Sequence, residues 1–144
     1  MRQRRPPAIL RRMPIQTIAS PNAPKAIGPY SQALLVDRGG VKTLYCSGQI
    51  AFDPATGELV QGDITAQTER VLQNVAAVLA ASGMSFANIV KTTVFLVDLA
   101  DFGKMNEVYG KRFSGAFPAR STVQVAALPR GALVEIEVTA VDGA

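Results

Sequence analysis

The 144-residue sequence contains no histidine, no tryptophan and a single cysteine, Cys46. Without histidine the chain cannot form a Ser–His or Cys–His nucleophile pair or a histidine-containing zinc site. One cysteine excludes an intramolecular disulfide and a multi-cysteine metal site, and it is typical of a reducing compartment. We expect Cys46 to be a small buried apolar residue rather than a nucleophile. Any chemistry must use Arg, Glu, Asp, Tyr, Ser, Thr, backbone groups and water.

Long apolar runs and phosphate-binding motifs are also absent. The sequence has no stretch of about eighteen apolar residues, the length that a helix needs to span a membrane. The sequence has neither G-x-G-x-x-G nor G-x-x-x-x-G-K-[ST]. We therefore expect no cofactor, no metal and no membrane partner.

The positive charge of the chain is confined to its beginning. The net charge is +4, and five arginines lie within the first twelve residues without any acidic residue. Subtracting five from +4 leaves −1 for residues 13–144. A nearly neutral body has no electrostatic footprint for a phosphate backbone, so nucleic acid is not the expected partner.

Residues 1–14 are predicted to form a flexible basic arm. Three interpretations stay open: a start assigned upstream of the true one at Met13, a disordered tail, or a short organelle-targeting segment. Pro6 and Pro7 oppose an amphipathic helix, which favours the first two. We expect a cytoplasmic protein, with a mitochondrial location as the alternative if the arm is a targeting segment.

Residues 15–144 are predicted to form one domain. Extended patterns at 30–37 and 41–50 flank a glycine turn and indicate a hairpin. Apolar residues at three-to-four spacing predict a helix over 63–82. A strand at 88–98, a second helix from Asp101 and two final strands follow. This order predicts an α+β fold with a mixed sheet and both helices on one face.

Alternation along the last two strands divides the sheet into an apolar and a polar face. Val134, Ile136 and Val138 alternate with Glu135, Glu137 and Thr139. On the preceding strand, the alternation is taken to place Arg120 and Thr122 on the polar face, opposite Val123 and Val125. A mixed polar face suits a subunit interface or a wet pocket, so self-association is expected.

Arg120 and Glu135 are the main candidates for chemistry. Arg120 follows Pro118, and its guanidinium can hold a carboxylate with two hydrogen bonds. A salt bridge to Glu135 or Glu137 explains it equally well. Glu135, between two apolar residues, is expected to be partly desolvated, with a raised pKa suited to deprotonating water. Glu137, one alternation step further on, is not distinguished from Glu135 by this argument. The alternative, favoured by pattern alone, is a charge that blocks edge-to-edge sheet pairing.

Four further residues are weaker candidates for substrate binding. Tyr30 lies at a loop-to-strand junction, where a phenol can bind a substrate or simply pack. Ser47 and Gly48 end a strand, and glycine permits close approach of a ligand or marks a bulge. Asn106 contacts a ligand or is merely exposed.

Six motifs together carry a resemblance to a known family: "AIGPYSQA", "YCSGQI", "TGELV", "VKTTVFLVDLADF", "MNEVY" and "FPARSTVQVAALPRGALVEIE". They resemble the Rid family, the YjgF-type reactive-intermediate deaminases, from about Ile15 to Val141. The resemblance implies a chorismate-mutase-like fold, a homotrimer with clefts between subunits, and a small carboxylate substrate. The implied reaction is hydrolysis of enamines and imines such as 2-aminoacrylate to 2-keto acids and ammonia.

The resemblance also implies individual roles. Arg120 matches the arginine that holds the substrate carboxylate, and Glu135 matches the glutamate that orients water. Tyr30, Ser47, Gly48 and Asn106 match pocket-lining positions. Thr122 stands where many relatives have cysteine, and the segment 111–120 is shorter than in common members. A non-catalytic carboxylate-binding module, or an RNA-directed translation inhibitor or chaperone-like protein, remains the alternative.

Overall fold

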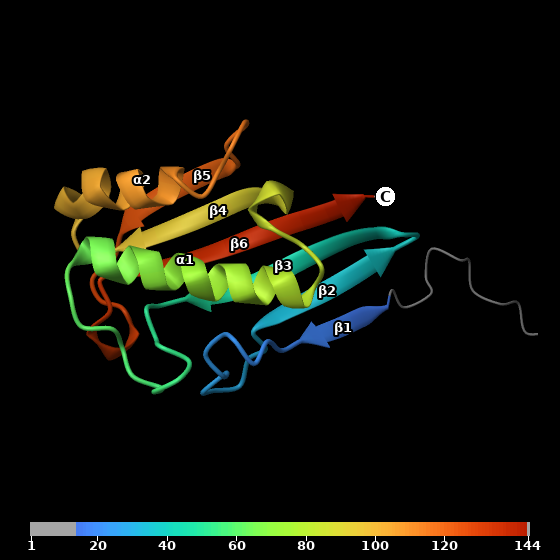
Figure 1. The fold of residues 1–144 in the computed structure, drawn as a ribbon, viewed down its shortest axis with the longest axis horizontal. Helices are drawn as coiled ribbons and strands as arrows, with labels where there is room; N and C mark the ends of the chain where they lie inside the picture. The colour runs from blue at the N-terminus through green and yellow to red at the C-terminus, as the bar shows by residue number, and fades with distance from the viewer. Residues whose placement is uncertain (1–13, 144) are drawn as a thin grey trace, which may run out of the picture.

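The computed structural model describes residues 14–143, so the predicted arm lies outside the described residues except for Pro14. Six strands form one sheet in the order β1-β2-β3-β6-β4-β5. Both helices cover one face of this sheet (Figure 1). The elements are β1 (Ile15–Ile18), β2 (Ala33–Arg38), β3 (Val41–Gln49), α1 (Ile64–Ala81), β4 (Ile89–Leu96), α2 (Phe102–Gly110), β5 (Ala119–Gln124) and β6 (Val134–Gly143). The predicted α+β class and the placement of both helices are confirmed.

The sheet is antiparallel except at one edge. β1 pairs with β2, β2 with β3, β3 with β6, and β6 with β4, all antiparallel. β4 and β5 pair in parallel. A parallel pair needs a crossover connection, and α2 supplies it. This crossover brings α2 over the edge of the sheet that contains Arg120.

α1 begins and ends where its sequence signals indicate. The Asp63 side chain accepts a hydrogen bond from the Ala66 N–H, which caps the first turn. Gly83 has a φ of 70°, the left-handed conformation that commonly ends a helix. The observed helix therefore differs from the predicted range by one residue at each end.

The hydrophobic core lies between the helices and the sheet face that they cover. α1 contributes Val71, Leu72, Val75, Val78 and Leu79, and the strands contribute Leu44, Val94, Leu96, Val134 and Ile136, among others. Cys46 is buried at this face, and burial raises the pKa of its thiol to about 12. The expectation that Cys46 is a buried apolar residue is confirmed.

β1 is an element that the sequence patterns did not predict. Its first three residues are exposed, and it pairs only with β2 at the edge of the sheet. A short, exposed edge strand has little apolar alternation to reveal it. Within residues 14–143, no helix has the length and apolar character needed to cross a membrane.

Candidate active site in two halves

Arg120 lies on the helix-covered face of the sheet, which corrects the predicted polar face. It is paired in register with Thr92, whose hydroxyl lies 2.8 Å from the hydroxyl of Tyr109 on α2. Side chains of paired residues share a face, so Arg120 also points towards α2. The alternation of side chains along β5 was predicted correctly, but the two sets of residues were assigned to the wrong faces of the sheet. Val123, whose apolar side chain was assigned to the core, is 42% exposed and lies on the open face, the face of the sheet that the helices do not cover.

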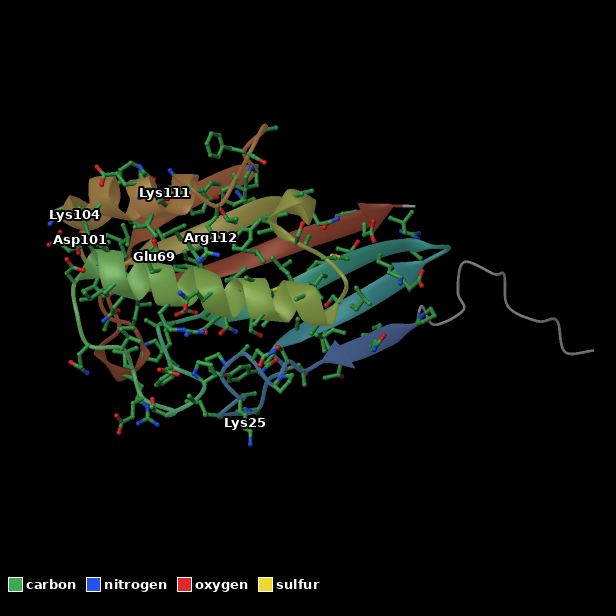
Figure 2. The ribbon with its side chains drawn as sticks, viewed as in Figure 1. Lys25, Glu69, Asp101, Lys104, Lys111 and Arg112 are labelled. Atoms are coloured by element: carbon green, nitrogen blue, oxygen red, sulfur yellow. The ribbon has the colours of Figure 1, made fainter. Side chains whose placement is uncertain are left out.

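Glu135 and Glu137 point to the opposite, open face of the sheet. They alternate along β6 with Val134, Ile136 and Val138, which are buried beneath the helices. The alternative of a salt bridge to Arg120 is therefore wrong. Across residues 14–143 the only ion pair joins Arg112 to Glu69 of α1 at 3.6 Å, and both are labelled in Figure 2.

One face of α2 holds the Arg120 guanidinium. Asn106 Oδ1 accepts a 2.7 Å hydrogen bond from Nη1 of Arg120. The guanidinium carbon lies 4.8 Å from the centre of the Tyr109 ring and 5.5 Å from that of Phe102. Phe102, Asn106 and Tyr109 are spaced by four and three residues, which places them on one side of a helix. Sequence reasoning missed Phe102 and Tyr109, although this spacing was visible.

Tyr109 is a fixed and neutral platform for Arg120. Its hydroxyl is hydrogen-bonded to Thr92 Oγ1. Burial raises the pKa of Tyr109, while the Thr92 hydrogen bond and the Arg120 charge act in the opposite direction. The ring is therefore neutral and supports the guanidinium through its π-face and not as a phenolate.

A cavity of about 450 Å³ opens in front of Arg120. Its lining consists of Asn106, Tyr109, Gly110, Phe117, Pro118 and Arg120. Among the described residues, no carboxylate forms a salt bridge with Arg120. Most of the five N–H donors of this half-buried group thus remain available to an anion from outside the protomer.

A second cavity, of about 280 Å³, contains the other predicted residues. Tyr30, Ser47, Gly48 and Glu135 line it together with Ile50 and Phe52, among others. Lys25 also belongs to the lining, on the loop between β1 and β2 (Figure 2). The structure thus brings four of the six predicted site residues into this cavity, and places Arg120 and Asn106 in the other.

Glu135 is a half-buried carboxyl with a perturbed titration. Burial raises its pKa, and the nearby negative charge of Glu137 raises it further. Its carboxyl packs directly against Gly48. A β-bulge between Cys46 and Gln49 shifts β3 against β6 at this point. A Cβ on Gly48 would lie 2.8 Å from Cδ of Glu135, so only glycine leaves room for this carboxyl position.

Ser47 and Tyr30 are linked through the loop before β2. The Ser47 hydroxyl donates a 2.6 Å hydrogen bond to the Ser31 carbonyl, and the Ser47 N–H donates to the Gln32 carbonyl at 2.9 Å. The Tyr30 hydroxyl accepts from the Ile27 N–H at 3.4 Å. The Ser47 hydroxyl proton is therefore already used in a hydrogen bond to the loop. The phenol proton of Tyr30 can still be donated to a ligand in the cavity.

The family model described as Endoribonuclease L-PSP matches residues 20–142. The chain belongs to the L-PSP family. The predicted membership of the Rid family is confirmed as well, because a solved structure of a Rid-family protein from Yersinia pestis is 51% identical, with a TM-score of 0.82, and the match covers 88% of this chain and 98% of that protein. Among the residues that the structure describes, no group of three or more His, Cys, Asp or Glu side chains could hold a metal ion.

Relatives match this L-PSP family chain over nearly its whole length. Protein DfrA of Myxococcus xanthus is 61% identical over 132 residues, or 92% of this chain and 99% of DfrA. The 2-iminobutanoate/2-iminopropanoate deaminase of Mus musculus is 51% identical over 128 residues, or 89% of this chain and 92% of the mouse protein. The crystal structure of E. coli TdcF with bound serine is 44% identical, with a TM-score of 0.81, and the match covers 89% of this chain and 99% of TdcF.

Proposed function

We propose that this protein hydrolyses imines, and the enamines that tautomerise to them, to 2-keto acids and ammonia. The observation that carries the proposal is Arg120: a half-buried guanidinium on a cavity, held by α2 and without a carboxylate partner among residues 14–143. Such a group is suited to a 2-imino acid carboxylate. The deaminase relative and the serine bound to TdcF support the same ligand class. A cytoplasmic location fits this role.

We further propose that each site is shared between two subunits of a homotrimer. Arg120 and Glu135 lie on opposite faces of one sheet, so a single chain cannot bring them to one substrate. The open face also exposes Leu34, Tyr45 and Val123, which a neighbouring subunit would cover. In a ring with a repeated head-to-tail contact, the Arg120 cavity of one subunit meets the Glu135 cavity of the next.

The residues have distinct roles in the proposed reaction. Arg120 binds the substrate carboxylate, a charge-assisted contact worth roughly 1.5–3 kcal/mol. Asn106, Tyr109 and Phe102 fix the guanidinium, so that the C=N carbon is held in one orientation. Tyr30 can donate a hydrogen bond to the substrate.

Glu135 of the adjoining subunit acts as the base. It accepts a proton from water as the water oxygen bonds to the carbon of the protonated imine, which gives a neutral carbinolamine. Glu135 then gives this proton to the nitrogen. As the C–N bond breaks and the C=O bond forms, Glu135 takes the hydroxyl proton, ammonia leaves, and the proton passes to solvent. The raised pKa of Glu135 makes it a stronger base than an ordinary carboxylate. The reaction as written needs only water and proton transfers.

A coupled assay tests this function. A serine or threonine dehydratase generates the enamine, and the rate of keto-acid release is measured with and without this protein. The wild type should accelerate release, and Arg120→Ala should lose the acceleration while keeping its oligomeric state. Arg38→Ala, an exposed arginine at the end of β2, is the matched control. A wild type that does not accelerate release, or a fully active Arg120→Ala variant, would refute the proposal.

A further inference from the structure

A fully buried amide at the middle of α1 holds the backbone of the Glu135 cavity. Asn74 is 0% exposed. Its Nδ2 donates hydrogen bonds to the carbonyls of Ile50, at 3.1 Å, and of Phe52, at 2.8 Å. Both residues line the cavity that contains Glu135. One side chain of the helix layer thus fixes two points on the wall of the proposed site.

Residues 50–52, which Asn74 holds, follow directly after β3, the strand whose Gly48 packs against Glu135. β3 ends at Gln49, and the Phe52 N–H donates back to the Ile50 carbonyl at 2.8 Å, which makes a tight turn. Gly48, which gives the Glu135 carboxyl its room, lies two residues before this turn. A movement of the turn is therefore passed to Gly48 and from there to Glu135.

Arg70 determines which way the amide points. Its Nε and Nη2 both donate to Asn74 Oδ1, at 3.0 and 2.7 Å. With two charged donors on the oxygen, the NH₂ group must face the two carbonyls. Charge-assisted hydrogen bonds also polarise the amide and strengthen the donors on its other side.

We propose that Asn74 is a positioning residue for hydrolysis, and that Arg70 acts through it to fix the wall against which Glu135 and its water are held. This inference rests on the proposed function. It goes beyond a contribution to stability, because the two residues whose carbonyls accept from Asn74 also line the cavity that contains Glu135.

The same helix provides a matched control. Thr68 is also 0% exposed, but its Oγ1 has no hydrogen-bond partner among residues 14–143. Thr68→Val changes a buried polar side chain of α1 without touching the cavity wall. It should leave the kinetics unchanged, because no hydrogen bond is lost.

The test compares Asn74→Ala, Arg70→Met and Thr68→Val at a temperature where all are folded, as checked by thermal melting. Asn74→Ala should lower kcat by ~10-fold to ~100-fold, since small misplacements of catalytic groups have effects of this size. Arg70→Met should give a smaller loss. The double variant should lose less than the product of the two, because both act through one amide. Arg70→Met also covers the case in which Asn74→Ala does not fold.

A second measurement separates positioning from stability. A looser wall admits water to Glu135, so its raised pKa should fall towards the ordinary value in Asn74→Ala. The acid limb of the pH–rate profile should move to lower pH, and carbon NMR of the Glu135 carboxyl should show the same shift without turnover. The charged and titratable groups nearby, Glu137, Lys25 and Tyr30, are unchanged in all variants.

Two outcomes would overturn the inference in an active wild type. In one, Asn74→Ala and Arg70→Met keep wild-type kcat and Glu135 titration. In the other, Thr68→Val reproduces their effects. A wild type without deaminase activity would instead refute the proposed function, and the NMR titration would still decide whether Asn74 and Arg70 fix Glu135.

Discussion

Gly48→Ala should displace the proposed base without unfolding the protein. The new Cβ would lie 2.8 Å from Cδ and 3.0 Å from Cγ of Glu135, whereas ordinary contacts begin at 3.4 Å. Restoring an ordinary contact moves the carboxyl carbon by 3.4 − 2.8 = 0.6 Å, and Oε1, which lies nearer to the new Cβ, must move further. A displacement of about 1 Å can reduce the rate ~100-fold, so we expect kcat to fall by ~10-fold to ~100-fold.

Stability should respond differently from activity. Gly48 is not among the glycines with positive φ, so alanine fits the backbone there. Loss of the flexible glycine stabilises the fold by roughly 0.4–1 kcal/mol, which offsets the cost of moving the Glu135 side chain. The melting temperature should therefore stay close to that of the wild type.

The coupled dehydratase assay and a thermal melt measure these two effects. Gly103→Ala in α2 is the control, because a Cβ there would have no neighbouring atom of the described part of the chain within 4 Å, and its φ is not positive. It should remain active. The double variant Gly48→Ala/Glu135→Gln should be no less active than Glu135→Gln alone, since Gly48 acts only through the position of that carboxyl. A Gly48→Ala enzyme with wild-type kcat would show that the position of Glu135 does not matter.

Three other predictions concern titration and reactivity. Glu137→Gln removes a charge that raises the pKa of Glu135, so the acid limb of activity should move to lower pH; an unmoved limb would count against Glu135 as the base. Because its folded-state pKa is raised, Glu135 contributes stability that is present below its unfolded pKa and is lost as pH rises through the folded value. Glu135→Gln should accordingly raise the melting temperature at neutral pH, with no gain below about pH 4; an equal difference at both pH values would contradict this. Cys46, buried with a pKa of about 12, should react with alkylating reagents at pH 7 only on unfolding, and rapid labelling of the folded protein would be inconsistent with the structure.

The sequence predicted the elements whose local patterns are strong. α1 has a capping aspartate, regular apolar spacing and a terminal glycine, so its range was nearly correct. The last strand alternates cleanly, and its buried face was assigned correctly. These features depend on neighbours in the chain, which a sequence displays directly.

The arrangement of the site depends on phase and on distant contacts, which a single sequence does not display. The face of β5 was assigned wrongly because Val123 is apolar yet exposed, while the half-buried Arg120 packs against two aromatic rings. The packing of Glu135 against Gly48 joins residues far apart in the chain through a β-bulge. Arg120 and Glu135 were recognised as lying on opposite faces of the sheet only when the structure showed which face each side chain occupies.

A subunit-mixing experiment tests the shared site most directly. Arg120→Ala and Glu135→Gln chains with different tags are co-expressed in equal amounts, and the mixed oligomers are assayed. Each variant alone should be inactive. In a randomly mixed ring, a site is intact when its Arg120 comes from a Glu135→Gln chain and its Glu135 from an Arg120→Ala chain. Each trimer that contains both kinds of chain has one such site out of three, so about one third of wild-type activity should return in the mixed oligomers. Mixed oligomers that stay as inactive as either parent would contradict a site built from two subunits.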